Sequence, residues 1–178
     1  ALATNGAVAF ASSDLGPELG IAYHVTANLH DGIYGNINSW ISGDADPGPQ
    51  AFVGVAFALP TAVAGIAWGR DNGNGAVDNS QAGTDACGGQ CGDRALGVYV
   101  IQITSVPNPN SGTPDEFWTT VGSVDYQRRE DALVGGGFTE FLRHAFEVSR
   151  NGAPIVATGI RLLVPATGLG GGTAVDEL

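Results

Sequence analysis

The stretch GVYVIQITSV, residues 97–106, has the pattern that decides the fold class of this chain. Its bulky residues Tyr99, Ile101 and Ile103 occupy every second position. Successive side chains of a β-strand point to opposite faces of a sheet. A period of two therefore predicts a strand that holds one face against an apolar core.

Comparable apolar or alternating runs lie on both sides of this stretch. The expected strands cover residues 8–13, 20–27, 50–60, 62–70, 97–106, 116–126, 141–149, 154–165 and 173–178. A short helix is expected only within residues 127–142. Such spacing is typical of sandwiches and barrels, so we predict an all-β, jelly-roll β-sandwich of about eight to ten antiparallel strands. We expect a single domain over residues 1–178, with a long loop at 70–94.

The composition agrees with many turns and few helices. The chain of 178 residues contains 28 Gly and 9 Pro, spread without a repeat, and 43% of it is apolar. A chain of this length can bury a core of its own. No apolar run approaches the ~20 residues needed to cross a bilayer, so we expect no membrane insertion.

The charge balance bears on possible partners. The formal net charge is −11, and all seven basic residues are Arg. An acidic surface repels phosphate backbones and anionic lipids, so nucleic acid is not an expected partner. An acidic surface without Lys fits a secreted or salt-tolerant protein, and we expect the protein to be secreted or on the extracellular surface.

The segment NLHDGIYGNINSW, residues 28–40, gathers oxygen-bearing side chains and two glycines in thirteen residues. Calcium takes about six to eight oxygen ligands, from carboxylates, amides, hydroxyls and main-chain carbonyls. Asp31 would supply charge, and Asn36 and Ser39 would supply neutral oxygens. The competing interpretation is a plain glycine-rich turn, since Asp-Gly and Asn are common turn residues. The loop lacks the spacing of an EF-hand, and a second carboxylate would have to come from elsewhere in the chain.

Five groups of residues are spaced along nearly the whole chain: Asp31, Gly32 and Trp40; Leu59, Val63 and Ile66; Trp118 and Val121; Arg161, Leu162 and Leu163; and Asp176 and Glu177. In their order they resemble the motifs of galactose-binding-like domains, a group that includes discoidin or coagulation-factor C-type domains and bacterial carbohydrate-binding modules. Each motif is weakly specific and mostly concerns the fold. The segment IYGNIN is longer than the usual insert before the Trp, which makes Asn36 the loosest counterpart.

The resemblance implies a structural calcium ion that joins the Asp31 loop to the closing strand. Asp31 and Ser39 are the best matched ligands, and Glu177 is the matching carboxylate. The carbonyls of Leu29 and Val175 would assist, with Asn36 as a further oxygen. Such an ion would stabilise the folded state by binding only to it.

The long loop at 70–94 holds both cysteines. A disulfide between Cys87 and Cys91 suits an oxidising compartment. The alternative is zinc, which normally needs four ligands, and the chain has no second Cys pair. We favour the disulfide and otherwise read the loop as solvated and acidic.

Sugars are held by aromatic faces and planar polar side chains, commonly on the end loops of such sandwiches. The expected ligand-binding residues are Trp68, Arg70, Asp71, Asn72, Arg94 and Tyr34, with His24 and Asp93 as further candidates. The competing interpretation places the Trp residues in the core and pairs Arg70 with an Asp.

The resemblance implies a non-catalytic, calcium-stabilised carbohydrate-binding module, secreted or on a cell surface, and possibly joined to further domains of a larger protein. The sequence has no G-x-S-x-G, H-E-x-x-H or phosphate-binding loop. Paired carboxylates of a glycosidase would meet only in the fold. The alternative is an adhesion or protein-interaction module of the same fold without a sugar pocket.

Overall fold

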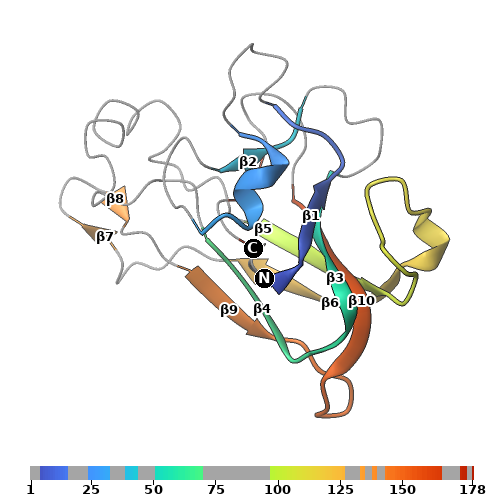
Figure 1. Cartoon of the computed structure of the whole chain (residues 1–178). Helices are drawn as coiled ribbons and strands as arrows, with labels where there is room; N and C mark the ends of the chain where they lie inside the picture. The colour runs from blue at the N-terminus through green and yellow to red at the C-terminus, as the bar shows by residue number, and fades with distance from the viewer. Residues whose placement is uncertain are drawn as a thin grey trace.

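A computed structural model gives the fold of this chain. It describes residues 5–15, 24–32, 39–43, 51–69, 97–126, 133–134, 138–139, 143–165, 173–175 and 178. The arrangement of these segments is shown in Figure 1.

The largest element is a five-stranded antiparallel sheet (Figure 1). Its strands are β1 (Val8–Ala11), β3 (Phe52–Val63), β10 (Ile155–Leu163), β5 (Gly97–Thr104) and β6 (Thr119–Tyr126), in that spatial order. Residues 159–163 of β10 pair with β3 on one side and β5 on the other. The last long strand of the sequence is therefore at the centre of the sheet.

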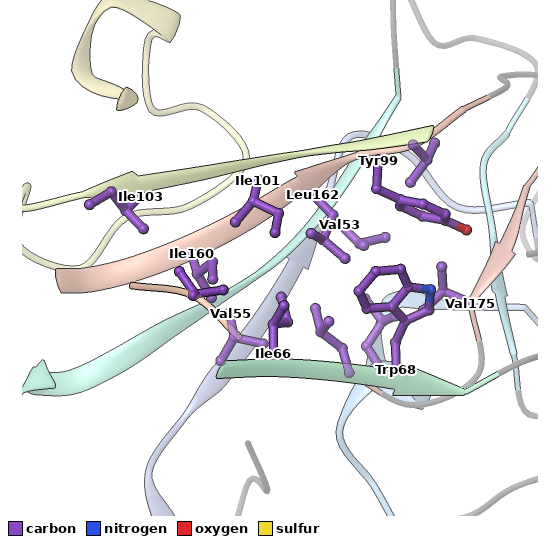
Figure 2. Close-up of a cluster of buried hydrophobic side chains, with 14 of the residues drawn as sticks. Val53, Val55, Ile66, Trp68, Tyr99, Ile101, Ile103, Ile160, Leu162 and Val175 are labelled. Atoms are coloured by element: carbon purple, nitrogen blue, oxygen red, sulfur yellow. The ribbon is translucent and has the colours of Figure 1, made fainter. Parts of the chain in front are cut away.

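A second layer covers one face of this sheet. It is formed by β4 (Gly65–Gly69), which pairs antiparallel with β9 (Arg143–Glu147). Figure 2 shows Ile66 and Trp68 of β4 pointing toward Val53 and Leu162 of the large sheet. The expected all-β sandwich is confirmed.

The core between the layers comes from alternate residues of each strand. Val53, Val55, Ile160 and Leu162 are all at most 4% exposed and belong to one cluster with Trp68. Burying such a side chain contributes about 1.5–3 kcal/mol relative to leaving it in water. The period of two in the sequence thus corresponds to the apolar face of the sheet.

Short elements complete the description. β2 (Trp40–Ile41) pairs with β11 (Ala174–Val175), and β7 (Leu133–Val134) pairs with β8 (Phe138–Thr139). Among the described residues there are two 3₁₀ helices, η2 (Thr26–Leu29) and η4 (Asp115–Phe117). Within the part of the chain that is described, no helix is long and apolar enough to cross a membrane.

Several expected boundaries differ from the observed ones, and the strand expected to end at residue 60 continues through Pro60 to Val63. The strand expected at 20–27 does not reach its end, because His24 has a φ of 59° and η2 begins at Thr26. The strand expected from residue 116 begins at Thr119, after η4. Within 127–142, where one short helix was expected, the described residues 133–134 and 138–139 form the strand pair of β7 and β8, and the other residues lie outside the described part of the chain.

The outer face of the large sheet carries a buried arginine. Arg161 is 3% exposed, and its guanidinium carbon lies 4.9 Å from the ring centre of Phe52 and 4.5 Å from that of Trp118. Its Nη2 donates to Asp115 at 2.6 Å and its Nε to Gln102 at 2.7 Å. These contacts hold the turn of η4 against the sheet, with the charge stacked on aromatic faces.

Candidate functional site

The segments expected to share a calcium ion lie together. Val175 of β11 pairs with Trp40 of β2, directly after Ser39. The main-chain N–H of Leu178 donates to the carbonyl oxygen of Leu29 at 2.8 Å. The Asp31 turn and the last residues of the sequence are therefore neighbours in the fold, as the resemblance implied.

Ser39 lies at the centre of a small polar cluster. It is fully buried, and its carbonyl oxygen accepts a hydrogen bond from Nδ2 of Asn28 at 3.1 Å. Nδ1 of His24 lies 3.0 Å from Oγ and 3.2 Å from the carbonyl oxygen of Ser39. Both oxygens that Ser39 would offer to a cation thus already have nitrogen partners.

Asp31 and Gly32 are exposed and follow η2. Gly32 has a φ of 78°, a conformation that glycine adopts without strain, and the main chain bends at Asp31 and Gly32. Asn36 and Glu177 lie outside the described residues. Across the residues that the structure describes, no group of three or more His, Cys, Asp or Glu could hold a metal.

The donor chemistry partly fits calcium. The described candidates are one carboxylate, one hydroxyl and carbonyl oxygens, all hard ligands of the kind that calcium takes. The carbonyl oxygen of Leu29 keeps a second lone pair beside its bond to Leu178. A second carboxylate would have to come from outside the described residues, where Glu177 lies.

Sequence reasoning missed the partners of Ser39. Asn28 is 9% exposed, and no role was predicted for it from the sequence. His24 was expected only as a possible sugar contact. Their 11- and 15-residue separations from Ser39 follow no strand or helix period, so only the fold brings them together.

Trp68 belongs to an aromatic cluster inside the sandwich. Its ring centre lies 4.7 Å from Tyr99, 5.3 Å from Tyr126 and 4.8 Å from Phe146. Its exposure is 0%, and Nε1 finds no hydrogen-bond partner within the described part of the chain. The ring therefore offers no open face on which a sugar could stack.

The other expected ligand contacts, Arg70, Asp71, Asn72, Arg94 and Tyr34, lie outside the described residues, as do Cys87 and Cys91 of the expected disulfide. Residues 70–96 connect the end of β4 to the start of β5. The expected end-loop site is thus joined to the strands that carry Trp68 and Tyr99.

Comparison with known proteins identifies solved structures that have a similar fold. No family model matches the sequence, and no curated protein matches it significantly. The family 32 carbohydrate-binding module of Clostridium perfringens NanJ, in complex with galactose, aligns over 96% of this chain and 90% of its own, with a TM-score of 0.55 and 15% identity. An F5/8 type C domain from Bacteroides fragilis has a TM-score of 0.60 and 12% identity, and covers 96% of this chain and 87% of its own.

A third solved structure is chitosan-binding module 2 of a Paenibacillus sp. IK-5 chitosanase/glucanase, in complex with chitotriose. It has a TM-score of 0.55 and 14% identity, and covers 96% of this chain and 92% of its own. This chain has the galactose-binding-like fold. The motif residues Trp118 and Arg161 are buried and in contact with each other, so their role is to stabilise the fold.

Proposed function

We propose that the chain is a non-catalytic carbohydrate-binding module that a structural calcium ion stabilises. The observation that carries the proposal is the likeness of fold over 96% of the chain to modules solved with galactose or chitotriose. The binding residues would lie on the end loop at 70–94, with Arg70, Asp71, Asn72 and Arg94, and with Tyr34 from the calcium loop. The module would act outside the cell or on its surface.

The test of sugar binding is a glycan array with calcium present, followed by calorimetry on each positive glycan. Replacing Arg70 with Ala should weaken binding about tenfold or more, because a charged hydrogen bond contributes about 1.5–3 kcal/mol. The matched control is Arg150→Ala, an exposed arginine after β9. An array without any positive glycan would contradict the proposal.

The calcium proposal rests on the closeness of Leu29 to Leu178 and of Ser39 to Val175. Asp31, Ser39, Glu177 and the carbonyls of Leu29 and Val175 would hold the ion, with Asn36 as a possible sixth oxygen. A bound ion there would link two segments far apart in the sequence.

Removing Asp31 should lower the thermal stability only when calcium is present. At a calcium concentration about 100 times Kd, the ion adds about 2.7 kcal/mol, or about 5–10 °C in Tm for a domain of this size. We expect Asp31→Ala and a chelator each to remove that gain in calorimetry. Asp125→Ala, at an exposed position on β6, should keep it. Equal Tm values with and without calcium in the unmodified protein would exclude the ion.

A protein-interaction module is the second candidate. Leu59 and Val156 are 74% and 65% exposed, on the paired strands β3 and β10. Exposed apolar side chains of this size are typical of contact surfaces when they gather into one patch. Loss of partner capture in Leu59→Ser, with glycan binding intact, would favour this second function.

A further inference from the structure

A groove of about 350 Å³ opens on the flank of the sandwich, between β6 and the end of β9. Its floor is apolar, because Ile101 and Val148 line it and are 3% and 4% exposed. Val121 and Val124 of β6 are partly buried and line it as well. The volume is at the lower end of the range for small-molecule sites, about 300–1,000 Å³.

The remaining lining residues are polar or small. Ser123, Ser149 and Glu147 are exposed and form a polar rim around the groove. None of the lining residues is basic. The groove therefore combines an apolar floor with hydrogen-bonding groups and one negative charge.

The edge of β6 shapes the groove. Four consecutive residues, 121–124, line it, so the main chain of β6 takes part as well as its side chains. β6 is the last strand of its sheet, and its pairing with β5 has a register shift between Ile101 and Gln102. Such a bulge and Gly122 interrupt the regular row of main-chain groups that an added peptide strand would need.

The chemistry of the groove fits one sugar ring better than a peptide. Aliphatic side chains can contact the C–H face of a pyranose, while hydroxyls, a carboxylate and main-chain groups bond its hydroxyls. Glu147 adds a preference for a positively charged ligand, since a charge-assisted hydrogen bond is stronger than a neutral one. The net charge of −11 on the whole molecule also favours a positively charged ligand.

We propose that this groove is a lateral subsite for an amino-sugar residue with a free amine, as part of a cationic polysaccharide. Glu147 binds the ammonium group, and Ser123 and Ser149 bind ring hydroxyls. The subsite rests on the proposed carbohydrate-binding function but is separate from the end loop.

The test compares β-1,4-linked glucosamine hexamer with its N-acetylated counterpart by calorimetry and NMR shift mapping. We expect the free-amine hexamer to bind at least about tenfold more tightly and to shift amide signals of residues 121–124. Glu147→Gln should weaken binding about tenfold. Glu116→Gln, which removes an exposed carboxylate on η4, is the matched control and should leave binding unchanged.

Gly122→Val tests the groove without changing any charged residue. A Cβ at residue 122 meets no atom within 4 Å, and a β-branched residue suits a strand, so the variant should fold and fill the groove. We expect at least about a tenfold loss of hexamer binding with an unchanged Tm.

Three results would overturn the subsite: equal binding of both hexamers, unchanged binding in both groove variants, or binding of a lysine-rich peptide in place of the hexamer. If other glycans on the array bind, and Arg70→Ala but not Glu147→Gln abolishes that binding, the proposed carbohydrate-binding function stands and only the lateral subsite is excluded.

Discussion

Gly54 lies where the large sheet has no room for a side chain. A Cβ at this position would come within 2.4 Å of the Phe10 ring and 2.7 Å of the carbonyl oxygen of Ile160. Phe10 packs with Trp118 at 5.9 Å between ring centres, next to the stacked guanidinium of Arg161. The missing side chain therefore lets the Phe10 ring pack directly against the main chain of Gly54.

Replacing Gly54 with Ala should destabilise the protein by about 1–3 kcal/mol, the usual cost of overpacking. The control is Gly122→Ala, also within a strand, where a Cβ meets nothing within 4 Å. There Ala should be neutral or slightly stabilising, because it restricts the unfolded chain. Urea unfolding followed by circular dichroism measures both changes. Equal stabilities of the two variants would contradict this account of the outer face.

β10 differs from the edge strands because it has neighbours on both sides. Residues 159–163 pair with β3 and with β5, whereas among the described strands β1 and β6 each pair with one. Opening β10 must break hydrogen bonds with both neighbours and expose buried residues such as Leu162. Edge strands open at lower cost in general.

Amide hydrogen exchange should therefore be slowest in β10 and β3 and faster in β6. Each 1.4 kcal/mol of additional opening free energy slows exchange about tenfold, so we expect central amides such as those of Val55 and Leu162 to be protected at least that much more than β6. Mass spectrometry of peptides covering 52–63, 119–126 and 155–163 measures the order. Faster exchange in β10 than in β6 would show that the sheet opens from its centre.

The long strands were predictable from sequence, and the short elements were not. Residues 97–104 and 155–163 form strands where alternating or apolar runs indicated them. η2 begins after His24, which has a positive φ although it is not a glycine. A positive φ at such a residue cannot be predicted from the sequence. β2, β7, β8 and β11 have two residues each, too few to show a period, and depend on partners brought by the fold.

The candidate site also has features that could be predicted from the sequence and features that could not. The meeting of the Leu29 turn with Leu178 was expected from the resemblance, not from any local pattern. The cluster of His24, Asn28 and Ser39 was not expected, because hydrogen bonds across 11 and 15 residues depend on tertiary contacts. Trp68 was ambiguous in sequence, since an aromatic residue at a strand end suits both a core and a sugar platform.

The charge of the whole molecule limits which polysaccharides can approach it. Eighteen acidic residues oppose seven arginines, and Glu147 at the groove and Asp31 after η2 each carry a carboxylate. At low salt this field extends about 30 Å, and near physiological salt about 8 Å. Anionic polysaccharides are therefore repelled before any contact with a binding residue.

Sulfated and carboxylated polysaccharides should not retard the protein in affinity electrophoresis at about 10 mM salt, where repulsion is strongest. Raising the salt to about 150 mM should not create tight binding, because screening removes repulsion without adding contacts. A neutral galactan gel is the matched control. Stronger retention by the anionic polymers at low salt would show that local arginines outweigh the net charge.

All three tryptophans are buried: Trp40 and Trp68 are 0% exposed and Trp118 is 7% exposed. Their intrinsic fluorescence therefore reports the packing of the interior rather than events at the surface. Emission should shift to longer wavelength only when the protein unfolds, and a glycan titration should leave it nearly constant. Fluorescence is thus the right signal for stability measurements on this protein, and calorimetry is the right one for its ligands.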